Sequence, residues 1–441
     1  MNAPGINVLG IDLGTSQAKA MLCAPDGTVL GRGAAGYEIA VPRDGWAETD
    51  PAHWWRAVVA AVRTAAVGPV AAIAVTGQMH GVLLVSEQSV VLRPAILWLD
   101  RRATAQAAAY RGLSARSLAV LGNAPAPGMA GPLLAWLARH EPDAYAAARW
   151  QFQPKDWLRF RLTGEPATDP TDASGTLLYD LSRGAWAQDV VDGLGLDSRL
   201  LPPVRGCAER AGALLPEAAA ELGLRPGIPV ATGASDTAAS LLAASLPGPE
   251  WALLTLGTGG QWIMPAGSAA DGDPTGRTSL FRAADGGLFR LGGAQNVGAA
   301  LNWVRGVLGA SWDELYGCAA NAAAAASRPP VFNPELVTER PRDEAAGAGG
   351  GWSGVTLAHT RDDLMSAALT GVAGLLRQRL DDLRAAGCVP EKVLLGGGGS
   401  RNPAWRDLLS DELGVPLYPA TTPWLTARGA TMIAAQITGN D

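Results

Sequence analysis

The chain has 441 residues, which is enough for two domains that each bury a core of their own. Hydrophobic residues make up 48% of it and charged residues 17%, with a formal net charge of −6, so the composition is that of an ordinary globular protein. No run of Lys and Arg interleaved with aromatic residues is present, which excludes nucleic acid and anionic membranes as expected partners. A small molecule is the expected ligand.

The four cysteines are scattered along the chain without a Cys-x-x-Cys pair: Cys23, Cys207, Cys318 and Cys388. Such spacing predicts buried thiols in a reducing compartment. The first residues contain neither a basic leader nor a cleavage signal, and no segment reaches the ~18 apolar residues that a membrane helix needs. We therefore expect a cytoplasmic protein.

The first half of the chain starts with short strands and then alternates helices with strands. Residues 6–33 predict three strands, and Asp50-Pro51 predicts a helix start, because Asp is a good N-cap and Pro suits the first helical position. The patterns that follow predict strands over 71–76, 82–86, 91–98 and 228–232, and helices over 101–111, 131–147 and 154–162.

From Trp251 the pattern begins again. Strands around Gly257-Thr258 are followed by strands near 277–291 and at 392–395, and by helices near 295–309, 311–325, 361–386, 403–413 and from Trp424. Because the opening motif recurs near residue 250, we expect an internal structural repeat and two domains, 1–247 and 248–441. This order of elements fits an α/β fold of two ribonuclease-H-like lobes with mixed sheets and a shared central cleft.

Each half contains an apolar strand that stops at Gly-Thr and a second strand that resumes after it. The first turn is Gly14-Thr15-Ser16 and the second is Gly257-Thr258-Gly259. The backbone N–H groups and the hydroxyl of such a turn can hold an anionic oxygen. One copy is only a hairpin, but two copies in opposite halves predict two lobes that hold a polyphosphate, and hence a nucleotide, between them.

Two aspartates end strands beside glycine-containing turns. Asp12 precedes Gly14-Thr15, where a carboxylate can hold Mg²⁺ through water, and a turn-capping role is the alternative. Asp236 can accept the proton of a substrate hydroxyl that attacks a γ-phosphate, or simply cap an Ala-rich helix. The second Gly-Thr turn favours the metal role for Asp12, whereas spacing alone leaves both roles of Asp236 open.

Two polar segments are candidates for a polyol site. The segment Gly77-Gln78-Met79-His80-Gly81 follows a predicted strand, and its Gln and His make a poor core segment but a good hydrogen-bonding rim. A structural histidine is the alternative. Trp98, near Asp100 and Arg101, could stack on a sugar, or the two charges could form an ion pair.

The four glycines at 396–399 lie between a predicted strand and a helix, where a backbone can approach adenosine phosphate or ribose. Asn402, on the first turn of that helix, could then hydrogen-bond ribose or base, and a bare helix-entry loop is the alternative. No Walker A lysine is present, so the chain is not a P-loop kinase.

In chain order, these motifs resemble the FGGY family of carbohydrate kinases, and the xylulokinases most closely among them. The matching segments are 10–16 (GIDLGTS), 50–55 (DPAHWW), 77–81 (GQMHG), 93–98 (RPAILW), 154–158 (PKDWL), 162–165 (LTGE), the Asp236 loop, 256–260 (LGTGG) and 397–402 (GGGSRN). They cover the chain almost end to end and keep the family's order, which makes the resemblance specific.

The resemblance implies an actin/hexokinase-type fold and ATP-dependent phosphorylation of a ketopentose, D-xylulose at O5, with Asp236 as general base and Asp12 helping to position Mg²⁺ and phosphate. Combined with the patterns above, it predicts that Asp12 and Asp236 hold Mg²⁺ through water. The predicted sugar contacts are Gln78, Met79, His80, Trp98, Asp236 and Thr237. The predicted ATP contacts are Thr15, Ser16, Gly257, Thr258, Gly398, Gly399 and Asn402. The expected partners are ATP and a sugar, with a homodimer as a candidate assembly.

Three positions depart from the family's pattern. Thr237 replaces the Asn that usually follows the catalytic Asp, so another ketose such as ribulose, or a sugar alcohol, is an alternative substrate. Gly259 replaces the Ser of the usual Gly-Thr-Ser-Gly turn, and Arg342-Asp343-Glu344 replaces the usual Thr-Pro-His. The alternative from another class is a non-catalytic ATP-dependent sensor or actin-like protein, although a pure binder has no use for a base such as Asp236.

Overall fold

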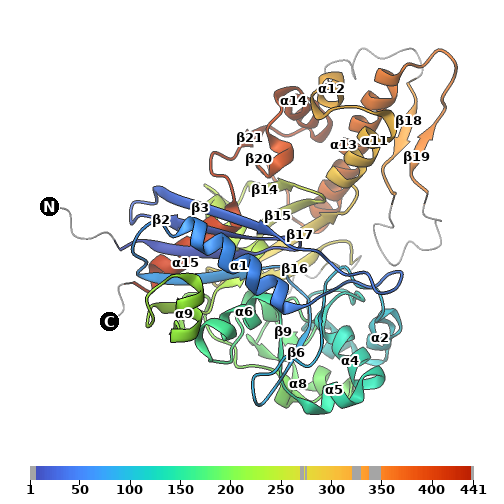
Figure 1. The fold of residues 1–441 in the computed structure, drawn as a ribbon. Coiled ribbons are helices and arrows are strands. Elements are labelled where there is room, and N and C mark those ends of the chain that lie inside the picture. Colours follow the sequence, from blue (N-terminus) through green and yellow to red (C-terminus); the bar gives the residue numbers. More distant parts are fainter. Residues whose placement is uncertain (1–5, 269–272, 274–275, 320–328, 337–348, 439–441) are drawn as a thin grey trace.

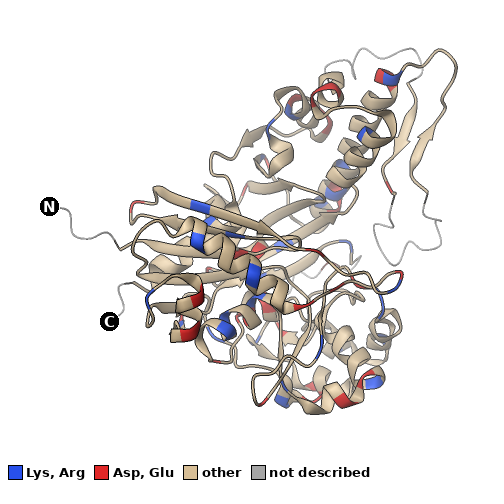
Figure 2. Cartoon of the chain, in the orientation of Figure 1, with Lys and Arg blue, Asp and Glu red and all other residues tan. Residues whose placement is uncertain are grey.

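The computed structural model describes residues 6–268, 273, 276–319, 329–336 and 349–438. Two mixed sheets form the centres of two lobes, one built mainly from the first half of the chain and one from the second (Figure 1). Acidic and basic residues are interspersed over both lobes (Figure 2). Within the described ranges, no helix combines the length and the apolar composition that crossing a membrane requires.

The first sheet has the strand order β11-β12-β5-β1-β2-β3. Its strands β1, β2 and β3 form an antiparallel meander, β5 and β12 continue it in parallel with β1, and β11 is antiparallel to β12. The short β13 also pairs with β5. The bounds are β1 (Val8–Leu13), β2 (Gln17–Cys23), β3 (Val29–Gly36), β5 (Ala72–Gly77), β11 (Arg210–Ala213), β12 (Pro229–Ala231) and β13 (Ala234–Ser235).

Alternate residues of β1 face opposite sides of this sheet. Leu9 and Ile11 pack with α1 (Pro51–Ala65) in one core cluster, whereas Val8 belongs to a cluster that contains residues of α15 (Leu425–Gln436). The alternation therefore turns Asp12 toward α15. The predicted start of α1 is confirmed, because its N-cap is Asp50 and a proline occupies its first position.

The second sheet has the order β16-β17-β15-β14-β20-β21, in which β14 to β17 are antiparallel neighbours and β20 and β21 continue in parallel with β14. Helices and a hairpin surround it. The bounds are β14 (Trp251–Leu256), β15 (Gly260–Ala266), β16 (Ser279–Arg282), β17 (Leu288–Ala294), α11 (Gly298–Leu308), α12 (Trp312–Gly317), β18 (Val331–Asn333), β19 (Gly351–Ser353), α13 (Arg361–Ala385), β20 (Lys392–Gly396), α14 (Pro403–Leu413) and β21 (Leu417–Pro419).

The strand order β3-β2-β1-β5-β12 of the first sheet recurs as β17-β15-β14-β20-β21 in the second. In each sheet an antiparallel meander precedes two parallel strands, and each Gly-Thr turn joins the first two strands of its meander. The predicted α/β fold with two ribonuclease-H-like lobes and an internal structural repeat is thus confirmed.

A largely helical insertion separates β5 from β11, and two predictions fail in it. The helix predicted over 131–147 is two helices, because Pro142 cannot donate the backbone hydrogen bond that continuation requires. The strand predicted over 91–98 shrinks to β7. The bounds within the insertion are β6 (Leu83–Ser86), β7 (Ala95–Ile96), α2 (Thr104–Ala109), α3 (Ala115–Ala119), α4 (Ala130–His140), α5 (Pro142–Ala147), β8 (Ala148–Phe152), α6 (Pro154–Thr163), α7 (Pro170–Ala173), β9 (Tyr179–Asp180), β10 (Ala185–Trp186) and α8 (Gln188–Gly193). Outside it, β4 (Glu48–Thr49) precedes α1 and α9 (Pro216–Leu222) follows β11.

The last helix, α15, returns to the first lobe (Figure 1). It packs on β1, β5 and α10 (Asp236–Ala244), although it follows the last strand of the second sheet. The approach is so close that a Cβ at Gly10 would lie 2.4 Å from the Ala427 carbonyl oxygen. The second half of the chain therefore contributes a helix to the sheet that carries Asp12, and the domain boundary near 247 stays a prediction.

Candidate active site

Asp12 lies in β1 and is 2% exposed. Its Oδ2 accepts a hydrogen bond from the Thr426 hydroxyl at 2.5 Å and lies 3.6 Å from the Lys19 ammonium. Its Oδ1 is buried and has no hydrogen-bond partner in the described part of the chain. Burial raises the pKa of Asp12, while Lys19 and Thr426 act to lower it. A water bound to a metal would satisfy the unpartnered oxygen.

Asp236 is the first residue of α10, directly after β13. The Ser235 Oγ accepts the Ala238 N–H and caps the helix, so the Asp236 carboxylate does not have this task. The Asp236 Oδ1 accepts hydrogen bonds from the backbone N–H and the hydroxyl of Thr237, at 2.6 and 3.1 Å. Both bonds go to the same oxygen, and neither engages Oδ2.

The electrostatics of Asp236 suit acid–base chemistry. Burial, and after it the negative charge of Asp12, raise the pKa of Asp236 to about 7, although the hydrogen bonds from Thr237 oppose the rise. A carboxyl that titrates near neutral pH can take a proton and release it again under working conditions. The structure therefore brings the two predicted carboxylates into one electrostatically coupled site.

Thr237 is predicted to contact the sugar, but its hydroxyl already has a partner. The residue is 3% exposed and donates to the Asp236 Oδ1. A hydroxyl in this position orients the candidate base. Its predicted contact with the sugar stays a prediction.

Gln78, Met79 and His80 follow the end of β5. Gln78 is 1% exposed, and neither atom of its side-chain amide has a partner among the described residues. The His80 Nδ1 lies 2.7 Å from the Gly175 carbonyl oxygen, so Nδ1 carries the proton and Nε2 is an acceptor. Burial lowers the pKa of His80, which favours this neutral ring. An unpartnered amide and a neutral imidazole are groups that a polyol can satisfy.

The first Gly-Thr turn is fixed by two aromatic residues. The Tyr37 hydroxyl donates to the Gly14 carbonyl oxygen, and the Tyr37 N–H donates to that of Ser16 at 3.0 Å. The indole N–H of Trp98 donates to the Thr15 Oγ1 at 3.1 Å. Trp98, a predicted sugar contact, is thereby joined to the turn that is predicted to hold phosphate.

A pocket of about 770 Å³ lies in the second lobe, between the second Gly-Thr turn, α11, α12 and α14. Ligand pockets commonly measure roughly 300–1,000 Å³, so a nucleotide fits by size. Trp312 and Tyr316 provide aromatic walls. The predicted ATP contacts that line it are Gly257, Thr258, Gly398, Gly399 and Asn402. Thr15 and Ser16, on the other turn, do not line it.

Within the glycine run 396–399, Gly398 is the position that faces open space. A Cβ at Gly398 would meet no atom of the described residues within 4 Å, whereas one at Gly399 would lie 2.9 Å from the Leu256 Cβ. Asn402 caps α14, since its Oδ1 accepts the Trp405 N–H at 3.1 Å. The Asn402 side-chain oxygen thus caps the helix, and the N–H groups of its side-chain amide are the candidates for contact with ribose or base.

A second group of carboxylates, from Asp156, Asp169 and Asp172, has spacing that could suit a metal. The Lys155 ammonium lies 2.5, 2.7 and 3.3 Å from their oxygens, and all four residues are at most 1% exposed. A buried ammonium already balances this cluster. Asp12 and Asp236 are therefore the better fit for Mg²⁺.

Sequence reasoning missed two residues that contact Asp12. Lys19 lies opposite it in the β1–β2 register, a pairing that could have been found by counting back from the Gly-Thr turn. Thr426 carries no such signal, because 414 residues separate it from Asp12. The departure from the family pattern at Arg342-Asp343-Glu344 lies outside the described residues.

Models of the N-terminal and C-terminal domains of the FGGY family of carbohydrate kinases match residues 7–243 and 252–437. The chain is 32% identical to a xylulose kinase of Escherichia coli, over 93% of this chain and 85% of that protein. It is 28% identical to a xylulose kinase of Bacillus subtilis, over 97% and 87%. The solved structure of xylulose kinase from Rhodospirillum rubrum matches it with a TM-score of 0.86 at 31% identity, over 99% of this chain and 90% of that one. Because the two family models together span most of its length, the chain belongs to the FGGY family of carbohydrate kinases.

Proposed function

We propose that this carbohydrate kinase transfers the γ-phosphoryl group of ATP to O5 of a ketopentose, with D-xylulose as the first candidate. The observation that carries the proposal is the coupled pair of carboxylates, the buried Asp12 and the titratable Asp236. The relatives from Escherichia coli and Bacillus subtilis support the choice of sugar, because both are named xylulose kinases.

In the proposed reaction, the Asp236 carboxylate accepts the proton of the sugar hydroxyl as its oxygen attacks the γ-phosphorus. The bond from that phosphorus to the bridging oxygen breaks, and ADP leaves. Thr237 engages Oδ1, so we assign Oδ2 as the proton acceptor. The Lys19 ammonium, 3.6 Å from Asp12, supplies positive charge beside the transferred group.

The sugar is proposed to bind along Gln78, Met79 and His80, with Trp98 beside it. The unpartnered Gln78 amide can both donate to and accept from hydroxyl groups, and the His80 Nε2 can accept from one. Exclusion of water when the lobes close would prevent wasteful hydrolysis of ATP.

ATP is proposed to place its adenosine in the second-lobe pocket, beside Gly398, Gly399 and Asn402, and its phosphates at the two Gly-Thr turns. Asp12 and Asp236 would hold Mg²⁺ through water, and the unpartnered Asp12 Oδ1 fits this role. When bound, the metal offsets negative charge on the phosphates.

Three further features belong to the proposal. We place the domain boundary between 247 and 248 and the protein in the cytoplasm, and we retain a homodimer as the candidate assembly. The cytoplasmic location is supported by the cysteines, all four of which are buried thiols.

The decisive experiment is a panel of D-xylulose, D-ribulose, L-ribulose, xylitol and glycerol in a coupled assay of ADP release. We expect the highest kcat/KM for D-xylulose, and phosphorus NMR should identify a 5-phosphate. A higher value for ribulose or xylitol would favour the alternative substrates that Thr237 suggests. Hydrolysis of ATP that no sugar stimulates, or filaments that form with nucleotide, would instead favour a sensor or an actin-like protein.

A further inference from the structure

A buried glutamine supports the loop that carries His80. Gln153 is 2% exposed and precedes α6. Its Oε1 accepts the His80 backbone N–H at 2.8 Å, and its Nε2 donates to the Asp172 carbonyl oxygen at 2.7 Å. One side chain thus joins the His80 loop to the segment 169–175.

The His80 backbone needs this support. Its φ is 72°, a conformation that residues other than glycine rarely adopt. The His80 backbone N–H donates to Gln153, and the His80 ring is held by the bond between Nδ1 and the Gly175 carbonyl oxygen. Because Nδ1 is engaged there, the position of Gly175 decides where the acceptor Nε2 points.

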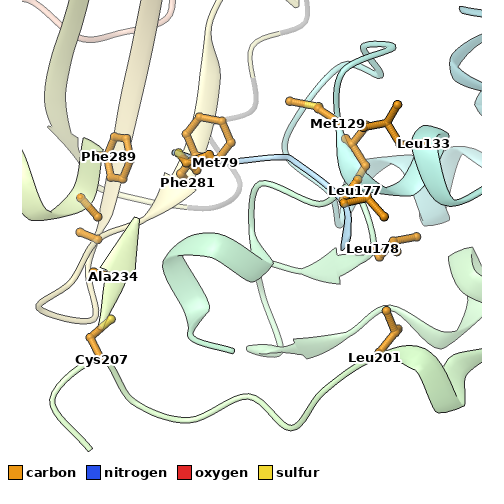
Figure 3. Close-up of a cluster of buried hydrophobic side chains, with 14 of the residues drawn as sticks. Met79, Met129, Leu133, Leu177, Leu178, Leu201, Cys207, Ala234, Phe281 and Phe289 are labelled. Atoms are coloured by element: carbon orange, nitrogen blue, oxygen red, sulfur yellow. The ribbon is translucent and has the colours of Figure 1, made fainter. Parts of the chain in front are cut away.

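Gly175 packs closely against His80 and Met79, two of the proposed sugar contacts. A Cβ at this position would lie 3.0 Å from both the His80 Nδ1 and the Met79 Cε. From the second lobe, the Phe281 ring of β16 lies with its centroid 5.9 Å from that of His80. Met79 and Phe281 belong to one buried cluster, shown in Figure 3. Close packing on these sides gives His80 and Met79 little room to move away.

The same short segment also supports the residue before Asp236. The Thr171 hydroxyl accepts the Ser235 N–H at 2.7 Å and donates to the Asp169 carboxylate at 2.5 Å. The Asp169 carboxylate is in turn held by the Lys155 ammonium. Thr171, Asp169 and Lys155 are fully buried, so this support is shielded from water.

We propose that the segment 169–175 is a positioning element that sets the spacing between the sugar loop and the base, and that Gly175 determines which length of sugar is accepted. The inference rests on the proposed function, because it requires that His80 and Met79 contact the sugar. A methyl group at 175 would displace both side chains by a few tenths of an ångström within the proposed sugar site. A five-carbon ketose would lose more binding affinity than a three-carbon polyol.

The test compares Gly175→Ala with Gly374→Ala, a control in α13 where, among the residues that the structure describes, an added Cβ would meet no atom within 4 Å. Because the displaced side chains are proposed to bind the sugar and not to react with it, we expect Gly175→Ala to raise the KM for the ketopentose about tenfold. We expect kcat to change by less than about threefold, the KM for ATP to stay unchanged, and kcat/KM for glycerol relative to the ketopentose to rise.

Substitutions at Thr171 test the contact between the segment 169–175 and Ser235, the residue before the base. Thr171→Val should lower kcat about tenfold with little change in KM, and Thr171→Ser, which keeps the hydroxyl, should restore it. Equal losses in both variants, or a Gly175→Ala enzyme whose KM for the sugar matches that of the control, would overturn the inference.

A readout without sugar separates failure of this inference from failure of the proposed function. The chain has four histidines, so the His80 ring signals in a proton–nitrogen NMR spectrum can be assigned with His80→Gln. They should shift in Gly175→Ala and not in Gly374→Ala. Unchanged signals refute the positioning role. A wild-type enzyme that phosphorylates no sugar refutes the proposed function, and with it the role of Gly175 in sugar selection, even if the His80 signals shift.

Discussion

Replacing Asp236 by asparagine should lower turnover and raise stability at the same time. The amide keeps the shape of the carboxyl and can still accept the two hydrogen bonds from Thr237. It cannot accept the proton of the sugar hydroxyl, so we expect kcat to fall ~10²–10⁴-fold, as is typical for loss of a general base. The expected gain in stability follows from the carboxyl's pKa.

The pKa of Asp236 is raised from its ordinary value of 3.8 to about 7, so the folded protein holds this proton more tightly than the unfolded chain does. Stability therefore falls as the pH rises from about 4 to about 7, and the whole penalty is present above pH 7. At ~1.4 kcal/mol per pKa unit, discounted for the partial exposure of the side chain, the penalty is on the order of 2–4 kcal/mol. Asp236→Asn removes it.

The measurements are sugar-dependent ADP release and urea unfolding followed by tryptophan fluorescence, at pH 8 and at pH 5.5. The variant should gain more stability at pH 8 than at pH 5.5. Asp143→Asn, an exposed aspartate in the first turn of α5, is the matched control and should change neither quantity. Wild-type turnover in Asp236→Asn would refute the assignment of the base, and a loss of stability at pH 8 would refute the electrostatic reasoning.

Three further predictions concern the neighbours of the base and the nucleotide pocket. With ATP well below saturation, kcat/KM for the sugar should fall about tenfold per pH unit below pH 7, because Asp236 must be ionised to act as the base. Asp12→Asn removes a neighbouring negative charge and should therefore move this fall in kcat/KM to lower pH. A pH profile that stays in place would contradict the electrostatic coupling between Asp12 and Asp236. Thr426→Val removes the hydroxyl that donates to Asp12, so it should lower the free energy of unfolding in urea by about 1–3 kcal/mol and should also lower turnover. The control Thr431→Val loses a hydrogen bond within the same helix and should leave turnover unchanged. Gly398→Val should raise the KM for ATP without lowering the urea midpoint of unfolding, because the added side chain would enter the pocket. The control Gly112→Val, at an equally open position of the first lobe, should leave the KM for ATP unchanged. Equal effects of the two substitutions on this KM would mean that the nucleotide binds elsewhere.

Local patterns in the sequence were enough to predict the elements around the site. The Gly-Thr turns, the N-cap at Asp50 and the strands beside them depend on hydrogen bonds and side-chain alternation over a few residues, which the sequence displays directly. The recurrence of the turn in the second half similarly predicted the repeated sheet. Prediction was weaker where a single proline divides a long apolar pattern, as at Pro142.

Only the tertiary structure decided which distant groups surround the two aspartates. Thr426 reaches Asp12 because α15 crosses back to the first sheet, and Gln153 and Gly175 reach His80 through the insertion. The pKa of Asp236 likewise depends on burial and on Asp12, more than two hundred residues away in sequence. Such contacts result from the packing of whole elements, and no periodicity or short motif records them.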